Sequence, residues 1–430
     1  MIALVMGRGV EGCGVTRYTI EYKNWLEKQG KDVVVYALKD KGNFTRANAQ
    51  KFDYKVFKIL TVRDKKQKQT RYIDIEDMSN RLNKCDYVLY MSIPSISNSD
   101  EAVDGFLKFC VEDVTVKKVF IQHDHKKQSL IRNAKMWEII KRCDVTFTHC
   151  ENSDFGEIYK KEFNSLFEKR VLHEFKIGID FSELAQYRKK FFEKVDRISY
   201  FGRFARFKHP ERLLELRKGL KANIITEMRG LERSIEAVDI YKRVYEEPYD
   251  IIDYQHSIKL AKEKIKDKEK LEEEIKRIQG EKETQNCFDK TYVYGPYSRD
   301  IGMEEISKSK FGCSFYELDA RAYGNHVEFA MLEIVGLGLI PIFSKHWGDN
   351  TKHISGKPFS QVENSGIYLE FRKQDKVCTN IDEVCNEIIK LNNNEKLYND
   401  YVDKCIEVYK QHSSTDVAFQ DLQKTIGKIL

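Results

Sequence analysis

The first 20 residues, MIALVMGRGVEGCGVTRYTI (1–20), decide the fold. Residues 1–6 form a short apolar run, which is typical of a buried strand, and a glycine-rich loop follows. The next segment has helical spacing and ends near Gly30. Glycines between a strand and a helix let backbone N–H groups approach a ligand oxygen, but a tight turn needs them equally. The spacing of the glycines matches neither the Walker A motif nor the G-x-G-x-x-G motif.

The same alternation of apolar runs and helical segments continues along the chain in two series. The expected strands of the first series are Val33–Leu38, Tyr87–Met91, Val119–Gln122 and Val145–Thr148; those of the second are Ile198–Phe201, Asn223–Glu227, Thr291–Tyr294, Phe311–Phe315, Ile340–Phe343 and Gly366–Glu370. Buried strands that alternate with helices favour a doubly wound parallel sheet. Two series predict two α/β domains with a boundary near residues 185–196, and 395–430 is expected to form two helices.

The composition places the chain among globular proteins. Its 430 residues are 41% hydrophobic and 33% charged, which excludes both a small stapled scaffold and a disordered chain. No run of about 18 apolar residues is present and no basic leader follows Met1, so we expect an intracellular protein without a membrane span or signal peptide. The ten cysteines include no C-x-x-C pair, which favours reduced thiols over a disulfide or metal framework.

Charge is distributed unevenly. Residues 1–190 carry 35 Lys and Arg against 27 Asp and Glu, whereas the remainder has a net charge of −2. The basic first half suggests a polyanionic partner, although an ordinary soluble surface would look the same. Residues 258–283 are almost entirely Lys, Glu, Ile and Leu. They predict an exposed helix or helical hairpin inserted in the second domain, or a coiled-coil partner site.

Two strand ends carry residues suited to chemistry. Gln122-His123-Asp124-His125 follows an apolar strand, where open α/β sheets place their ligands. These residues are suited to acid/base catalysis or to stabilising positive charge. The alternatives are a His-x-His pair that binds a metal and polar groups with a purely structural role. In the second series, Gly202-Arg203 is followed by Lys208. Arg and Lys at that spacing are suited to binding a diphosphate; the alternative is a pair of basic residues on the surface.

Glu333 lies in an otherwise apolar segment that precedes Gly338 and an Ile-Pro strand start. A carboxylate there is suited to accepting hydrogen bonds from two ribose hydroxyls; the alternative is that the segment is an ordinary amphipathic helix. Together with Arg203 and Lys208, this pattern resembles the GT-B glycosyltransferase architecture, which implies two Rossmann-like domains facing a central cleft. That architecture commonly has glutamates eight residues apart, but here position 325 is Asn and Glu328 lies five before Glu333.

A closer resemblance rests on five strings in order: GVEGCGVTRYTIE (9–21), QHDH (122–125), NSDF (152–155), GLERS (230–234) and NSGI (364–367). They resemble the DNA α-glucosyltransferases of T-even bacteriophages. The likeness covers most of the chain, lapses at about 240–290 and is weak at about 40–80. It implies retaining transfer of glucose from UDP-glucose to the hydroxymethyl group of 5-hydroxymethylcytosine in duplex DNA, without a metal or other cofactor, by a monomer in the cytoplasm of an infected bacterium.

The resemblance also implies a domain plan and residue roles. Residues 1–190 would form the acceptor domain and 191–410 the donor domain, with the insertion at about 250–290, while 411–430 would form a helix that crosses back to the first domain. The catalytic residues implied are Glu21, His123 and Asp124, with His123 on the sugar and Asp124 at the anomeric carbon or the acceptor proton. The donor-site residues implied are Gly14, Arg203, Lys208, Gly230, Glu328 and Glu333. Arg229 departs from the family, which has an acidic residue there.

Chemistry on a base inside a duplex requires the nucleotide to be flipped out, so the acceptor domain should be basic. The residues expected to bind DNA are Lys65, Lys66, Lys68, Arg71, Lys126, Lys127 and Arg132. A solvated basic loop is the alternative for the first four. Two other functions remain open: the same fold acting with another nucleotide sugar or on hydroxymethyluracil DNA, a protein, a glycan or a lipid, and a binding or assembly protein that has lost catalysis.

Overall fold

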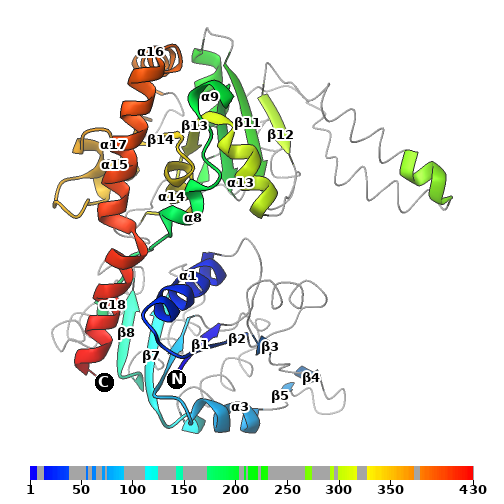
Figure 1. The fold of residues 1–430 in the computed structure, drawn as a ribbon, viewed down its shortest axis with the longest axis vertical. Helices are drawn as coiled ribbons and strands as arrows, with labels where there is room; N and C mark the ends of the chain where they lie inside the picture. The colour runs from blue at the N-terminus through cyan, green and yellow to red at the C-terminus, as the bar shows by residue number, and fades with distance from the viewer. Residues whose placement is uncertain are drawn as a thin grey trace. The chain divides into compact units, whose positions relative to one another are not determined.

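A computed structural model gives the fold (Figure 1). It describes residues 1–6, 14–37, 55–56, 61–63, 70–72, 75–91, 112–123, 142–148, 172–202, 208–209, 212–220, 224–230, 267–273, 291–294, 299–316, 327–371 and 378–429. The chain divides into two compact units. The first unit comprises Met1–Asp180, Asp319–Val327 and Ser413–Leu430; the second comprises Phe181–Leu318 and Glu328–His412.

The first unit is built on a parallel sheet. Within the described residues its seven strands lie in the order β3-β2-β1-β6-β7-β8-β9. Their bounds are β1 Ile2–Met6, β2 Val33–Ala37, β3 Lys55–Val56, β6 Tyr87–Tyr90, β7 Lys117–Gln122, β8 Val145–Thr148 and β9 Leu172–Glu174; β4 Thr61–Arg63 and β5 Thr70–Tyr72 form a separate antiparallel pair. Strand β1 is buried at every position, as its continuous apolar run requires for a strand covered on both faces.

Three helices of the first unit are described: α1 Gly14–Lys28, α3 Ile75–Leu82 and α18 Thr415–Ile429. Helix α1 ends where the sequence predicts, because Gly30 adopts a φ of +72° and its N–H donates to the carbonyl of Glu27 over 2.9 Å. The Lys31 N–H donates to the carbonyl of Leu26 over 3.0 Å. A residue in this left-handed conformation closes a helix, and glycine adopts it without a steric cost.

The last helix, α18, packs on the first, α1 (Figure 1). The Trp25 indole N–H donates to Asp416 Oδ1 over 2.7 Å, and the Tyr22 hydroxyl donates to Gln423 Oε1 over 2.8 Å. The ring of Phe419 lies 5.0 Å from that of Tyr22. The first unit is therefore completed by residues about 400 positions along the chain from the helix they cover.

The second unit repeats the parallel arrangement. Its six strands within the described residues lie in the order β12-β11-β10-β13-β14-β15. Their bounds are β10 Val195–Gly202, β11 Ile225–Gly230, β12 Thr291–Tyr294, β13 Ser309–Ser314, β14 Ile340–Ser344 and β15 Ile367–Leu369. The helical segments are α8 Phe181–Ala185, η2 Phe191–Glu193, α9 Arg212–Gly219, α13 Arg299–Ser307, α14 Phe329–Gly336, α15 Lys345–Asn350, η4 Phe359–Gln361, α16 Ile381–Asn392 and α17 Glu395–Ser413.

The predicted fold class, two doubly wound α/β sheets with parallel strands, is confirmed. Every strand expected from an apolar run has a counterpart, and 395–430 forms the two helices α17 and α18. Strands β3, β4, β5 and β9 are not among those that the sequence predicts. Of the charged segment 258–283, only 267–273 is described, and 268–273 is helical. The domain limits and the acceptor and donor assignments stay predictions.

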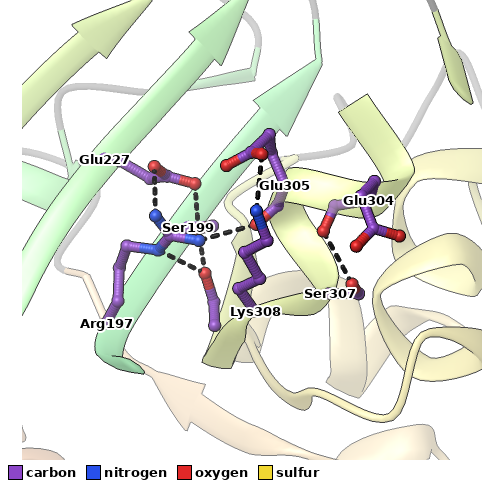
Figure 2. A network of polar contacts seen from close by, with 8 residues as sticks. Arg197, Ser199, Glu227, Glu304, Glu305, Ser307 and Lys308 are labelled. Atoms are coloured by element: carbon purple, nitrogen blue, oxygen red, sulfur yellow. Dashed lines mark hydrogen bonds and ion pairs between the residues drawn. The ribbon is translucent and has the colours of Figure 1, made fainter. Parts of the chain in front are cut away.

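A buried polar network lies in the second unit (Figure 2). Arg197 near the start of β10 places Nη1 3.0 Å from Glu227 Oε2, and its Nε donates to Ser309 Oγ over 2.6 Å. Ser199 donates to the other Glu227 oxygen, Oε1, over 2.5 Å. Glu227 is completely buried. The network joins β10, β11 and β13 away from the carboxyl ends of the strands, so we interpret it as structural.

The buried amine of Lys194, beside this network, should make the stability of the protein depend on pH. Its Nζ donates to the carbonyl of Ser307 over 2.9 Å, and burial, with nearby Arg and Lys cations, lowers its pKa from 10.5 to about 7. Between about pH 7 and 10.5 the unfolded chain therefore binds more protons, so the free energy of unfolding rises with pH, by at most about 1.4 kcal/mol per unit. Below pH 7 the penalty of burying the charged amine is complete.

The Lys194→Met variant should therefore gain stability relative to the wild type most strongly at pH 6, with a gain that shrinks toward pH 9. Urea denaturation of both proteins at pH 6, 7, 8 and 9 measures this difference, and titrations elsewhere in the chain cancel in it. A difference that is constant over these four pH values would contradict the prediction.

Candidate active site

His123 lies immediately after β7, at the carboxyl edge of the first unit's sheet, and is half-buried. Its imidazole is 4.8 Å from the ring of Tyr18, at 71°, and 5.1 Å from the ring of Phe175, at 79°. These are edge-to-face contacts, which aromatic rings prefer. The carboxyl edge of a parallel sheet is where open α/β folds bind ligands, so His123 is placed as the sequence predicts for a site residue.

Glu21 is on α1, one turn beyond Tyr18, and is only 2% exposed. It forms an ion pair with Arg17, four residues earlier on the same helix. Removing a carboxylate from water is costly unless a cation and hydrogen bonds compensate for it, so Arg17 keeps Glu21 compatible with burial. Gly14, another expected site residue, is the first residue of α1 and is exposed.

In the second unit, two glycines lie side by side at the carboxyl edge. Strand β10 ends at Gly202 and β11 ends at Gly230, and the two residues are paired in register. Gly202 is buried and has a φ of +138°, a conformation that side-chain-bearing residues rarely adopt. The absence of a Cβ at both strand ends lets a ligand approach the backbone closely.

Lys208 and Glu328 come together although 120 residues separate them. Lys208 Nζ is 3.0 Å from Glu328 Oε2, and the two side chains are only 17% and 15% exposed. The Tyr316 ring, which follows β13, has its centroid 5.8 Å from the same Nζ. A lysine cation shielded from solvent attracts an anion more strongly than one in bulk water does. This position suits the phosphate-binding role that the sequence assigns to Lys208.

Glu328 and Glu333 occupy different positions on α14. Glu328 is the N-cap residue with extended backbone, whereas Glu333 lies within the helix and is 8% exposed. A five-residue separation does not place two side chains on one face of a helix, since neighbours on a face are three or four apart. The two carboxylates therefore serve different contacts, and Glu328 is the one that pairs with Lys208.

Eight of the expected site residues lie outside the described residues: Asp124, Lys126, Lys127, Arg132, Lys65, Lys66, Lys68 and Arg203. Arg71, which is expected to bind DNA, is in β5. Sequence reasoning missed Tyr18, Phe175 and Tyr316. A signal existed for two of them: Tyr18 lies in the TRYTIE string, and Tyr316 directly follows a buried strand.

Among the described residues, no group of three or more His, Cys, Asp or Glu side chains is arranged to hold a metal ion. No described helix combines the length and the apolar character needed to span a bilayer.

Comparisons with known proteins identify what this chain resembles. The family described as DNA alpha-glucosyltransferase matches residues 13–388. The DNA alpha-glucosyltransferase of Enterobacteria phage T4 is 25% identical over 445 residues, covering 99% of this chain and 100% of the relative. An alpha-glucosyltransferase solved with UDP-glucose and DNA containing an abasic site is 23% identical, with a TM-score of 0.78 and 99% of each chain covered. Another solved structure, with UDP and DNA containing an HMU base, is 22% identical with a TM-score of 0.75, and the match covers 99% of each chain.

Proposed function

The chain belongs to the DNA alpha-glucosyltransferase family, and on that premise we propose that it transfers glucose from UDP-glucose to the hydroxymethyl group of 5-hydroxymethylcytosine in duplex DNA. The family match over residues 13–388 carries this proposal. The reaction breaks the bond between glucose C1 and the diphosphate and forms a bond from C1 to the hydroxymethyl oxygen. UDP leaves with the bonding electrons, and the hydroxyl proton is released. The proposal includes retention of configuration at C1.

The second unit would bind the donor. Arg203 and Lys208 would hold the diphosphate and stabilise the negative charge that develops on leaving UDP, which requires no metal. The shielded ion pair of Lys208 with Glu328 supports this assignment, because it holds a cation near the carboxyl edge of the sheet. Glu333 would bind the ribose hydroxyls. The backbone at Gly230 would approach the UDP-sugar, and the family resemblance gives the same role to Gly14, which belongs to the first unit.

The first unit would bind the acceptor. His123 would contact the sugar and Asp124 would stabilise positive charge at C1 or assist the acceptor proton, with Glu21 also contributing. The basic residues expected to bind DNA would contact phosphates around a flipped-out nucleotide. The protein would act as a monomer in the cytoplasm of an infected bacterium, since the related enzyme is from a phage.

The test offers the purified protein three duplexes, containing hydroxymethylcytosine, hydroxymethyluracil or neither, with UDP-glucose or another nucleotide sugar. Mass spectrometry of the digested nucleosides should show one hexose on hydroxymethylcytosine only when UDP-glucose is present. Asp124→Asn controls for a contaminating enzyme and should lower the rate by about 100-fold or more. Transfer only to hydroxymethyluracil, only from another donor, or to no DNA at all would contradict the proposal.

A further inference from the structure

Three rings meet at the carboxyl end of β7. Besides their contacts with His123, the rings of Tyr18 and Phe175 lie 5.4 Å apart at 77°, so each pair in the trio is edge-to-face. Tyr18 is completely buried and Phe175 is 5% exposed. A half-buried histidine at the end of a strand is thus in contact with two buried aromatic side chains.

The surroundings of Tyr18 indicate that its ring, and not its hydroxyl group, is the part that acts on His123. The hydroxyl is buried and has no hydrogen-bond partner among the described residues. Burial also raises the pKa of Tyr18 far above 10, so the phenol stays neutral at any working pH. It cannot act as a base, and phenylalanine would supply the same ring.

The C-terminal helix supports this ring from another side. The Phe419 ring on α18 lies 5.4 Å from the Tyr18 ring at 88°. Helix α18 is itself fixed to α1 by the hydrogen bonds of Trp25 with Asp416 and of Tyr22 with Gln423. Tyr18 therefore lies in a packed cluster that leaves little room for another rotamer.

We propose that Tyr18 and Phe175 are positioning residues, whose rings fix the orientation of the His123 imidazole, and that α18 fixes Tyr18 through Phe419. The inference rests on the proposed function, in which His123 contacts the sugar. Without these rings the imidazole would occupy several staggered rotamers, and only some of them would face the substrate. Misplacement of a catalytic group by about 1 Å can cost 100-fold in rate.

The test compares three variants on α1. Tyr18→Leu removes the ring and should lower kcat by about 10- to 100-fold, with the KM for UDP-glucose within about twofold of the wild type. Tyr18→Phe retains the ring and should restore kcat to within about threefold. Leu26→Ala is the matched control: Leu26 is equally buried and lies two turns farther along α1, outside the ring cluster. It should lower Tm at least as much as Tyr18→Leu while kcat is retained.

A second readout does not depend on activity. In protein labelled with ¹³C at histidine Cε1, the His123 signal, assigned with His123→Gln, should shift in Tyr18→Leu and in Phe175→Leu because a neighbouring ring current is lost. It should stay near its wild-type position in Leu26→Ala. An unshifted His123 signal in Tyr18→Leu would overturn the contact itself.

The kinetic outcomes separate the two proposals. Wild-type kcat in Tyr18→Leu, or an equal loss of kcat in Leu26→Ala, would overturn the positioning role while leaving the glucosyltransferase assignment standing. Absence of transfer by the wild type, or full activity of His123→Gln, would instead refute the proposed function or the role it gives to His123.

Discussion

We expect the Arg197→Met variant to lose about 3 to 5 kcal/mol of the free energy of unfolding. The substitution removes the guanidinium that pairs with the completely buried Glu227 carboxylate. Arg197 also donates to Ser309 Oγ and to the carbonyl of Glu305, each over 2.6 Å, so these acceptors lose their donor as well (Figure 2). Guanidinium denaturation followed by circular dichroism measures the loss.

Two controls identify the buried charge as the cause. Adding Glu227→Gln to Arg197→Met removes the buried negative charge, while the amide oxygen still accepts from Ser199, so the double variant should recover at least half of the loss. Lys345→Met breaks the exposed pair of Lys345 with Glu370 and should change the free energy of unfolding by less than about 1 kcal/mol. An Arg197→Met variant as stable as the exposed control would contradict the expectation.

Binding of UDP should weaken by about 10- to 100-fold in the Lys208→Met variant, because hydrogen bonds to charged groups contribute about 1.5–3 kcal/mol. The variant also leaves Glu328 negative at the place proposed for the diphosphate, which adds repulsion. Isothermal titration calorimetry with UDP measures the Kd directly and does not require a working acceptor.

Adding Glu328→Gln to Lys208→Met removes that repulsion and should recover part of the affinity. The matched control is Lys390→Met on α16, which makes the same charge change at an exposed i,i+3 pair with Glu387. Its Kd for UDP should remain within about twofold of the wild type. If Lys208→Met binds UDP as tightly as the control does, Lys208 is not part of the diphosphate site.

The sequence predicts the sheets well because their strands are buried on both faces and read as apolar runs. The sequence does not predict the strand residues that are polar or charged and are buried only because a partner side chain pairs with them. Strand β10 begins at Val195, three residues before the expected Ile198, since Arg197 is an interior residue only through its distant partner Glu227. Strand β13 likewise begins at Ser309, within the same polar network.

The candidate site follows the same division. The sequence places Gly202 and His123 at the carboxyl ends of apolar strands, and the structure has them there, at the edge where parallel sheets bind ligands; their roles stay predictions. The contacts of Lys208 with Glu328 and of Tyr18 with Phe175 could not be predicted from the sequence, because each joins segments more than 100 residues apart. Asp124 and Arg203 stay predictions.

The packing of α18 on α1 has a consequence for synthesis of the chain. Residues 1–180 are made well before α18, yet their hydrophobic core lacks Phe419 and the hydrogen-bonding partners of Trp25 and Tyr22 until residues 415–429 have been made. At about 5 to 20 residues per second, translation of the intervening stretch takes on the order of 10 to 50 s. The first unit therefore cannot finish folding until α18 has been made, and a nonsense mutation that removes α18 would damage a core whose other parts are made much earlier.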